Sequence, residues 1–154
     1  MIQTREIELS TRGHADIRDL TAGIERLVAD SGIRDGLVSI FTPSATSGLT
    51  TIEFEDGALD DLRATLDRLV PPDAEYRHNL RWGDGNGHAH IRAALLGPSL
   101  CVPVQEGRIR LGTWQQIVFV DFDVRPRRRK VVVQILGDPA EAKPPGAAGI
   151  AGDG

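Results

Sequence analysis

Hydrophobic and polar positions near the start of the chain predict a strand followed by a helix. Residues 2–9 alternate, with some irregularity, between two faces, which is typical of a half-exposed strand, and Gly13 interrupts the pattern. From Asp16 onward the apolar residues recur at helical spacing, at Ile17, Leu20, Ile24, Leu27 and Val28. This spacing predicts a helix that begins near Asp16 and ends at Ser31 and Gly32, because glycine is the usual residue just beyond a helix.

Further along, apolar runs rich in β-branched residues predict strands at 36–42 and 48–54. An amphipathic helix follows, with Leu59, Leu62, Leu66 and Leu69 on one face, and Pro71 ends it. Four strand-like runs come later, at 99–104, 108–111, 115–123 and 129–136. The short connections at 106–107 and 124–126 predict antiparallel pairing of consecutive strands.

Strands at both ends of the chain with helices between them predict an α+β fold. We expect a mainly antiparallel sheet or a split β-sandwich with two or three helices on one side. Residues 1–137 are expected to form a single domain. Residues 138–154 are rich in Ala, Gly and Pro and contain few large apolar side chains, so we expect a disordered tail.

The segment 82–98 concentrates the candidate chemistry of the chain. Gly83, Gly85 and Gly87 alternate with Asp84 and Asn86, a spacing that lets backbone N–H groups converge on an anion. Asp84, Gly85, Asn86 and Gly87 are therefore candidate phosphate-binding residues. The alternative interpretation is a glycine-rich turn in which Asn86 only caps the next helix.

Two histidines are predicted to lie on either side of the start of that helix. His88 and His90 precede an apolar stripe that continues to Gly97 and Pro98, which form a stop signal. The partial positive charge of a helix N-terminus favours neutral imidazoles and a bound phosphate. We therefore treat His88 and His90 as catalytic candidates, while the alternative is that both are simply solvated.

His78 is the third histidine in this part of the sequence. Three imidazoles with an open coordination position could hold a zinc ion that polarises an oxygen or activates water. His78, His88 and His90 are thus predicted ligands of a divalent metal, whereas magnesium would bind through a substrate phosphate. His14 is distant in sequence and is expected to be unrelated.

Polar residues on the predicted strands supply further candidates. Thr46 and Ser47 offer hydroxyl groups beside Gly48, and Glu53 could act as a carboxylate ligand or a base. The strand at 115–123 carries apolar residues on both faces, which predicts a central position in a sheet. A buried Gln115 or Gln116 there would need a partner, either a ligand, a neighbouring subunit or backbone at the strand end.

A dense basic run lies at Arg125 and residues 127–130. Guanidinium groups hold phosphate through paired donors, so Arg127 and Arg128 are candidate phosphate or subunit contacts. The alternative is a solvated turn that keeps a sheet edge soluble.

Composition excludes several classes of function. The chain has 154 residues and a formal net charge of −4, which argues against a general nucleic-acid surface. No apolar stretch is long enough to cross a membrane, and the first residues lack a signal-peptide pattern, so we expect a cytoplasmic protein without a membrane partner. The single cysteine, Cys101, lies in an apolar run and is predicted to be buried without a disulfide partner.

Several motifs together resemble a known family. The run at 84–100, followed by Pro103 and Val104, by 111–115 and by Asp121 to Asp123, closely resembles the YjbQ-like family, also called secondary thiamine-phosphate synthase enzymes. The resemblance extends from about Ile2 to Gly137. It implies a compact α+β homotrimer whose sites lie near subunit interfaces, with a weak activity that joins a pyrimidine diphosphate to a thiazole phosphate.

By position, the polar cluster of that family falls on His78, Asp84, Asn86, His88 and His90. One departure is evident. Many members carry a histidine before the Gly-Leu-Thr segment, whereas this chain reads Ser-Ala-Thr-Ser at 44–47. Thr46, Ser47 and Glu53 are left to line that wall.

Three hypotheses follow from the sequence. The first is a small trimeric transferase acting on a phosphorylated substrate at the histidine-rich segment. The second is a non-catalytic homotrimer that binds a metal or a phosphorylated metabolite in the same pocket. The third assigns the histidines a structural role at the subunit interface.

Overall fold

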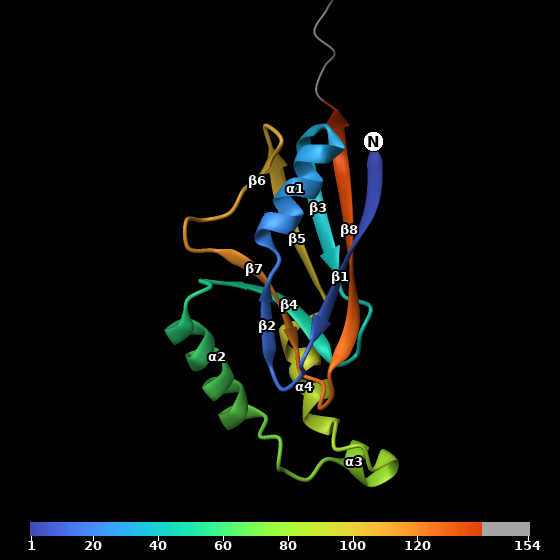
Figure 1. Cartoon of the computed structure of the whole chain (residues 1–154), viewed down its shortest axis with the longest axis vertical. Helices are drawn as coiled ribbons and strands as arrows, with labels where there is room; N and C mark the ends of the chain where they lie inside the picture. Colours follow the sequence, from blue (N-terminus) through green and yellow to red (C-terminus); the bar gives the residue numbers. More distant parts are fainter. Residues whose placement is uncertain (140–154) are drawn as a thin grey trace, which may run out of the picture.

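The computed structural model describes residues 1–139 and consists of two antiparallel sheets with four helices among these residues (Figure 1). The larger sheet has the strand order β1-β8-β3-β5-β6, and the smaller has the order β2-β7-β4. The strands are β1 Ile2–Thr11, β2 Asp16–Asp19, β3 Ile33–Phe41, β4 Ser47–Ile52, β5 Ser99–Gln105, β6 Arg108–Ile109, β7 Gln116–Asp121 and β8 Arg127–Pro139. The helices are α1 Thr21–Ser31, α2 Asp56–Leu69, α3 Arg77–Trp82 and α4 Gly87–Leu96. The expected α+β class is confirmed.

The smaller sheet lies between two hydrophobic cores. On one of its faces Ile117 and Phe119 of β7 join α1 and the inner face of the larger sheet. On the other face Val118 and Val120 join α2 and α4. Because successive side chains of a strand point to opposite faces, one strand serves both cores. The predicted central position of β7 is therefore confirmed.

Residues 16–19 form a strand, so the prediction that the first helix begins near Asp16 was wrong. Ile17 pairs with Val120 and Asp19 with Val118 in an antiparallel ladder, and α1 begins only at Thr21. The Thr21 hydroxyl accepts a hydrogen bond from the Ile117 amide, which fixes the helix start against the sheet. Pairing with a buried strand outweighed the helical spacing of the apolar residues.

The short connection at 124–126 does not join paired strands, contrary to prediction. The chain leaves the smaller sheet after β7 and enters the larger sheet as β8, between β1 and β3. A short link implies a nearby strand, but here that strand belongs to the other sheet. The predicted pairing holds for β5 and β6, which are joined at Glu106 and Gly107.

Cys101 is exposed, so the prediction of a buried thiol was wrong. In β5 the side chains of Val102 and Val104 enter the core, and Cys101 and Pro103 therefore point to the outer face of the larger sheet. Alternation along the strand determined its position, whereas the apolar neighbours in sequence did not.

The two ends of the molecule differ in character (Figure 1). Helix α1 lies near one end, together with the chain start and the end of β8, while α3 and the start of α4 lie at the other. Strand β8 continues to Pro139, so the predicted tail at 138–154 begins within it, and residues 140–154 lie outside the described residues. Among residues 1–139, none of the helices has the length and apolar character that crossing a bilayer requires.

Candidate functional site

The glycine-rich loop connects α3 to α4 and uses its glycines for different purposes. Gly83 and Gly85 have φ values of 64° and 68°, in the left-handed region that favours glycine. Gly87 is the first residue of α4, and a Cβ there would lie 2.4 Å from the Cβ of Tyr76. Two glycines therefore shape the turn, and the third lets α4 pack against Tyr76.

Several amides of this loop already have partners within the chain. The Asn86 amide donates to the Asp84 carboxylate, the Gly87 amide donates to the Asn79 side chain, and the Gly83 amide donates to the Asn79 carbonyl. These amides cannot at the same time converge on an anion. Phosphate binding by the glycine turn, through Gly85 and Gly87, remains a prediction. Within one chain, the loop does not present a set of free amides that converge on an anion.

His78 and His90 face each other across the junction of α3 and α4. Their ring centroids are 4.3 Å apart with an angle of 41° between the ring planes, and His78 Nδ1 lies 3.3 Å from a carboxylate oxygen of Asp84. Burial lowers the pKa of His90, as does the neighbouring His78, although Asp84 and Asp123 partly oppose the change. His90 is therefore a neutral imidazole at pH 7, able to donate one hydrogen bond.

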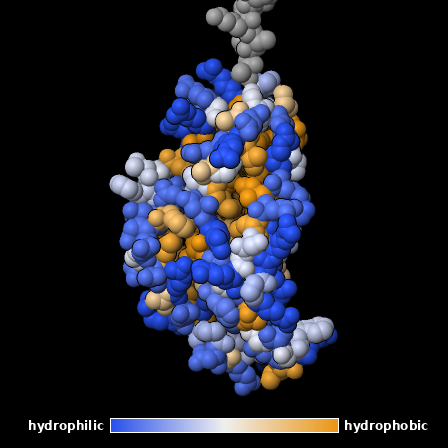
Figure 2. Space-filling model, in the orientation of Figure 1, coloured by the Kyte–Doolittle hydropathy of each residue, from blue (hydrophilic) through white to orange (hydrophobic). Residues whose placement is uncertain are grey.

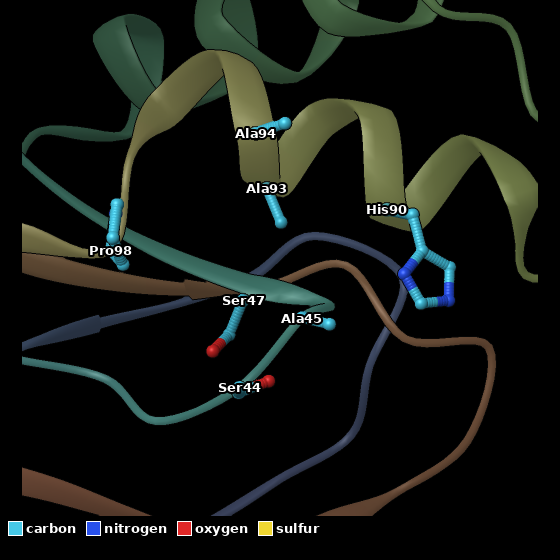
Figure 3. A pocket seen from close by; sticks show the side chains of 7 residues that line it. All are labelled: Ser44, Ala45, Ser47, His90, Ala93, Ala94 and Pro98. Carbon is cyan, nitrogen blue, oxygen red and sulfur yellow. The ribbon is translucent and has the colours of Figure 1, made fainter.

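A cavity of about 290 Å³ opens beside His90 (Figure 3). His90 projects from the first turns of α4 toward the segment that carries Ser44, Ala45 and Ser47. Ala93, Ala94 and Pro98 complete the lining. The Ser47 hydroxyl is buried and shares a hydrogen bond of 2.8 Å with the Thr42 hydroxyl. The predicted residues Ser47 and His90 thus lie on one cavity.

Behind this cavity a buried network contains two carboxylates, Asp121 and Asp123. Arg129 donates to both oxygens of Asp121, at 2.7 and 2.8 Å. Asp123 accepts from Thr46 at 3.0 Å and from the Asn86 side chain at 3.3 Å. Asn86 precedes α4 without capping it, because its side-chain Nδ2 donates to Asp123 and its side-chain Oδ1 accepts from the Val124 backbone N–H.

The network determines the charge of Asp123. Burial alone would raise the pKa of Asp123, but hydrogen bonds from Arg127, Asn86 and Thr46 outweigh that effect, so the pKa lies below its ordinary value. Asp123 is therefore ionised at neutral pH. Sequence reasoning missed Asp121, Asp123 and Arg129 as a unit, and the available signal was an Asp-Phe-Asp segment followed by a strand with an arginine on its inner face.

The basic run is divided by the alternation of β8. Arg129 points inward, and Arg127 contacts Asp123 at 3.1 Å from the rim. Arg128 and Lys130 point to the opposite face, where they contact Glu8 and Glu6 of β1 at 3.3 and 2.9 Å. Arg128 is exposed, as expected if the basic run is a solvated turn. Phosphate binding by Arg127 or Arg128 remains a prediction.

Glu53 and Gln115 lie far from the histidines within this chain. Ser47 begins β4 at the His90 cavity, whereas Glu53 follows its last residue and is exposed. Gln115 contacts Thr51 near that same far end, donating to its hydroxyl at 3.1 Å. One chain therefore divides the predicted site residues between two ends of a strand.

His88 lines a different cavity from His90, so the two histidines do not share a site within one chain. It is buried, its ring centroid is 6.4 Å from that of Tyr76, and its cavity also contains His14. Helix α4 already includes both histidines, and positions two apart on a helix point about 200° apart. The prediction that they lie on either side of the helix start was wrong.

No group of three potential metal-ligating side chains is suitably placed within residues 1–139. His78 and His90 are adjacent, but His88 does not join them. Metal binding by His78, His88 and His90 therefore remains a prediction, and it would need a ligand from beyond this part of a single chain.

Two packed antiparallel sheets with a histidine pair at one end define a small α+β protein. Comparison with known proteins identifies its family. The model of the UPF0047, YjbQ-like family matches residues 5–138, and the chain belongs to this family. A UPF0047 protein of Archaeoglobus fulgidus is 43% identical over 131 residues, which are 85% of this chain and 99% of that protein. A UPF0047 protein of Methanothermobacter thermautotrophicus is 38% identical over 138 residues, covering 90% and 94%.

Solved structures agree with this assignment. A protein of unknown function from Sulfolobus solfataricus superimposes with a TM-score of 0.85 at 33% identity, covering 90% of this chain and 99% of that one. An uncharacterised YjbQ/UPF0047 protein of Clostridium acetobutylicum gives a TM-score of 0.79 at 36% identity, covering 86% and 99%. The resemblance inferred from the motifs is confirmed at the level of the family.

Proposed function

We propose that the chain is a weak transferase of the thiamine-phosphate synthase type, acting as a cytoplasmic homotrimer. The observation that carries this proposal is His90, which lines the same cavity as Ser44 and Ser47 and lies against His78, itself beside Asp84. A neutral imidazole and two hydroxyl groups around one hollow are suitable donors for a phosphorylated ligand. The activity itself is inferred from the resemblance to the family.

The reaction requires stabilisation of a leaving diphosphate. A nitrogen of the thiazole phosphate attacks the methylene carbon of the pyrimidine diphosphate, a C–N bond forms, and the C–O bond to diphosphate breaks with its electron pair on the leaving oxygen. Donors that are already positioned around that oxygen lower the barrier. His90, Ser44 and Ser47 would supply these donors, and Arg127 would add positive charge at the rim.

The homotrimer would bring together the candidate residues that lie at the two ends of β4. Glu53 and Gln115 of one subunit would meet His78 and His90 of the next, in a contact repeated around a threefold axis. The negative charge of Glu53 would then favour the positive charge that the thiazole ring acquires. Large apolar residues are exposed at both ends in support of such a contact: Trp114 is 71% exposed, Leu80 72% and Trp82 65%.

The surface around α3 carries exposed hydrophobic residues, which supports a subunit contact there. Figure 2 shows hydrophobic residues among polar ones over the region of α3. The buried cores of most interfaces are enriched in aromatic and large aliphatic residues. A heterologous contact between this end and the end that carries Trp114 would bury both groups.

An assay with both thiamine precursors tests the transferase. We expect wild-type protein to form thiamine phosphate above the uncatalysed background, and His90→Asn to reduce the rate by about tenfold or more, because the shorter asparagine amide does not place its N–H where the imidazole places its own. Arg68→Gln, which removes an exposed charge on α2, is the control and should leave the rate unchanged. No product above background, or equal rates for wild type and His90→Asn, would exclude the transferase.

A second candidate is a non-catalytic homotrimer that binds a metal or a phosphorylated metabolite. It is favoured by the segment 44–47, which lacks the histidine that the resemblance to the family implies there, and whose Ala45 lines the His90 cavity. Saturable binding without turnover would support it. Elemental analysis of protein purified without a histidine tag tests the metal, zinc or magnesium, independently of any activity.

A further inference from the structure

A second cavity, of about 200 Å³, lies on the other side of α4 from the His90 cavity. It is formed where α2, α4 and the turn between β1 and β2 meet. The charged or titratable residues of its lining are His14, Arg63, Asp67, His88 and Arg92. The proposed transferase reaction uses none of them, and the position of His14 in the sequence predicted no relation to the other histidines.

Two of the lining side chains are almost fully buried. His88 and Arg92 are each 4% exposed. Arg92 donates to the Val70 carbonyl at 2.7 and 3.0 Å and to Asp67 at 2.7 Å. These bonds hold its guanidinium group in place at the cavity wall.

His88 has a buried polar atom without a partner. Its Nδ1 makes no hydrogen bond to any of the described residues. A buried donor or acceptor without a partner is destabilising, so such atoms usually have a ligand, a water or a catalytic role. The residue lines the cavity, which makes a ligand in that cavity the direct explanation.

Two arginines line the cavity, and each is paired with one carboxylate: Arg92 contacts Asp67 at 2.7 Å and Arg63 contacts Asp60 at 3.0 Å. Among the described residues, Arg92 Nη1 and Arg63 Nη2 have no hydrogen-bond acceptor, so each guanidinium group keeps a nitrogen that can donate to a ligand.

Burial is the main cause that lowers the pKa of His88; Arg92 and His14 lower it further, while a hydrogen bond with the Gly85 backbone and the Asp67 carboxylate partly oppose the change. His88 is therefore a neutral imidazole at pH 7.

The turn between β1 and β2 is strained in a way that places His14. His14 and Ala15 have φ values of 54° and 60°, in the left-handed region that non-glycine residues rarely occupy. The His14 amide donates to the Asp123 carbonyl at 2.8 Å, and Arg63 donates to the Ala15 carbonyl at 3.2 Å. These bonds maintain the conformation, which puts His14 on the wall of the cavity. Such strain is commonly found at ligand sites.

We propose that this cavity binds the phosphate group of a small phosphomonoester. Arg63, Arg92 and the imidazoles of His14 and His88 supply the donors, and guanidinium groups match the geometry of phosphate oxygens. An adjoining cavity of about 470 Å³ shares His14, Ala15 and Arg63 with it and continues to Arg12 and Asp16. That space accommodates the organic part of the ligand, which distinguishes an ester from free phosphate.

The histidines provide a direct test, because the chain contains only four. His14 and His88 line the proposed phosphate cavity, whereas His78 and His90 belong to the transferase site. Imidazole NMR signals are therefore recorded during separate titrations with ribose 5-phosphate and inorganic phosphate at constant ionic strength. We expect saturable shifts of the His14 and His88 signals, with ribose 5-phosphate binding at least as tightly as inorganic phosphate.

Variants decide whether the arginine charge is responsible. Arg63→Gln should weaken ribose 5-phosphate binding by about tenfold, since one charge-assisted hydrogen bond is lost. Arg68→Gln, on the exposed side of the same helix, should leave it unchanged. His14→Asn should also weaken binding, and asparagine tolerates the left-handed backbone.

The proposal is overturned if the His14 and His88 signals do not move, or if only those of His78 and His90 do. Equal affinities of the Arg63→Gln and Arg68→Gln variants would overturn it as well. Binding of inorganic phosphate alone would exclude a phosphomonoester as the ligand. A circular dichroism spectrum of each variant shows that it is folded, and none of these outcomes depends on transferase activity.

Discussion

Arg129 is the residue on which the interior of the site end most depends. Its side chain is 14% exposed and neutralises Asp121, which is fully buried. Replacing one partner of a buried ion pair typically costs about 3–5 kcal/mol, because the other charge is left uncompensated. We therefore predict that Arg129→Met lowers the free energy of unfolding by an amount in that range, measured by urea denaturation.

Lys130→Met is the matched control, since Lys130 is the next residue and pairs with Glu6 on the solvent side. It should lower the stability far less. Equal losses for the two variants would mean that the buried network is not held by Arg129. Acid should act on the same network: the pKa of Asp123 is lowered in the folded protein, so its contribution to stability is present above the ordinary carboxyl pKa and is lost as the pH falls through the folded pKa.

At the scale of the element, two helical glycines should respond in opposite ways to the same substitution. A Cβ at Gly23 in α1 would make an ordinary contact of 3.6 Å with Ile7, whereas one at Gly87 in α4 would overlap Tyr76 at 2.4 Å. Alanine favours a helix over glycine by about 1 kcal/mol. We predict that Gly23→Ala stabilises the protein and Gly87→Ala destabilises it.

Thermal unfolding of both glycine variants, followed by circular dichroism, measures this difference. The expected result is a higher Tm for Gly23→Ala and a lower Tm for Gly87→Ala than for wild type. If Gly87→Ala were stabilising, the close packing of α4 against Tyr76 could not be what requires glycine there.

The sequence predicted those elements whose hydrophobic pattern follows one period. Leu59, Leu62 and Leu66 of α2 and the two apolar faces of β7 face the cores as predicted. Leu69, which was placed on the same face of α2, is 70% exposed at the end of the helix. The pattern at 16–20 was ambiguous, since Ile17 and Leu20 suit a helix while Ile17 in fact pairs within a sheet. Long-range pairing decided that segment, and local spacing does not contain it.

The candidate site was predictable in its components but not in its arrangement. His78, Asp84 and His90 come together as expected from their proximity in sequence. His88 is separated from His90 because α4 starts earlier than predicted, and His14 reaches His88 only through the fold of the β1–β2 turn. Glu53 and Gln115 are separated from the histidines by the length of β4, and no local motif contains that separation.

At the scale of the whole molecule, the proposed transferase requires residues from two subunits at each site. Each chain carries the imidazoles at one end of β4 and the carboxylate of Glu53 at the other, so the proposed transferase site would be complete only between copies. His90→Asn and Glu53→Gln subunits should therefore be nearly inactive as separate homotrimers. Together they should complement each other, because some interfaces then receive both wild-type groups.

Co-expression of the two variants under different affinity tags, followed by isolation of the mixed trimers and the assay with both thiamine precursors, tests this most directly. Each mixed trimer, whichever variant it contains twice, has one interface in three that receives both wild-type groups, so we predict recovery of about a third of wild-type activity. Mixed trimers that remain as inactive as the separate variants, or a Glu53→Gln protein with full activity alone, would contradict a site shared between subunits.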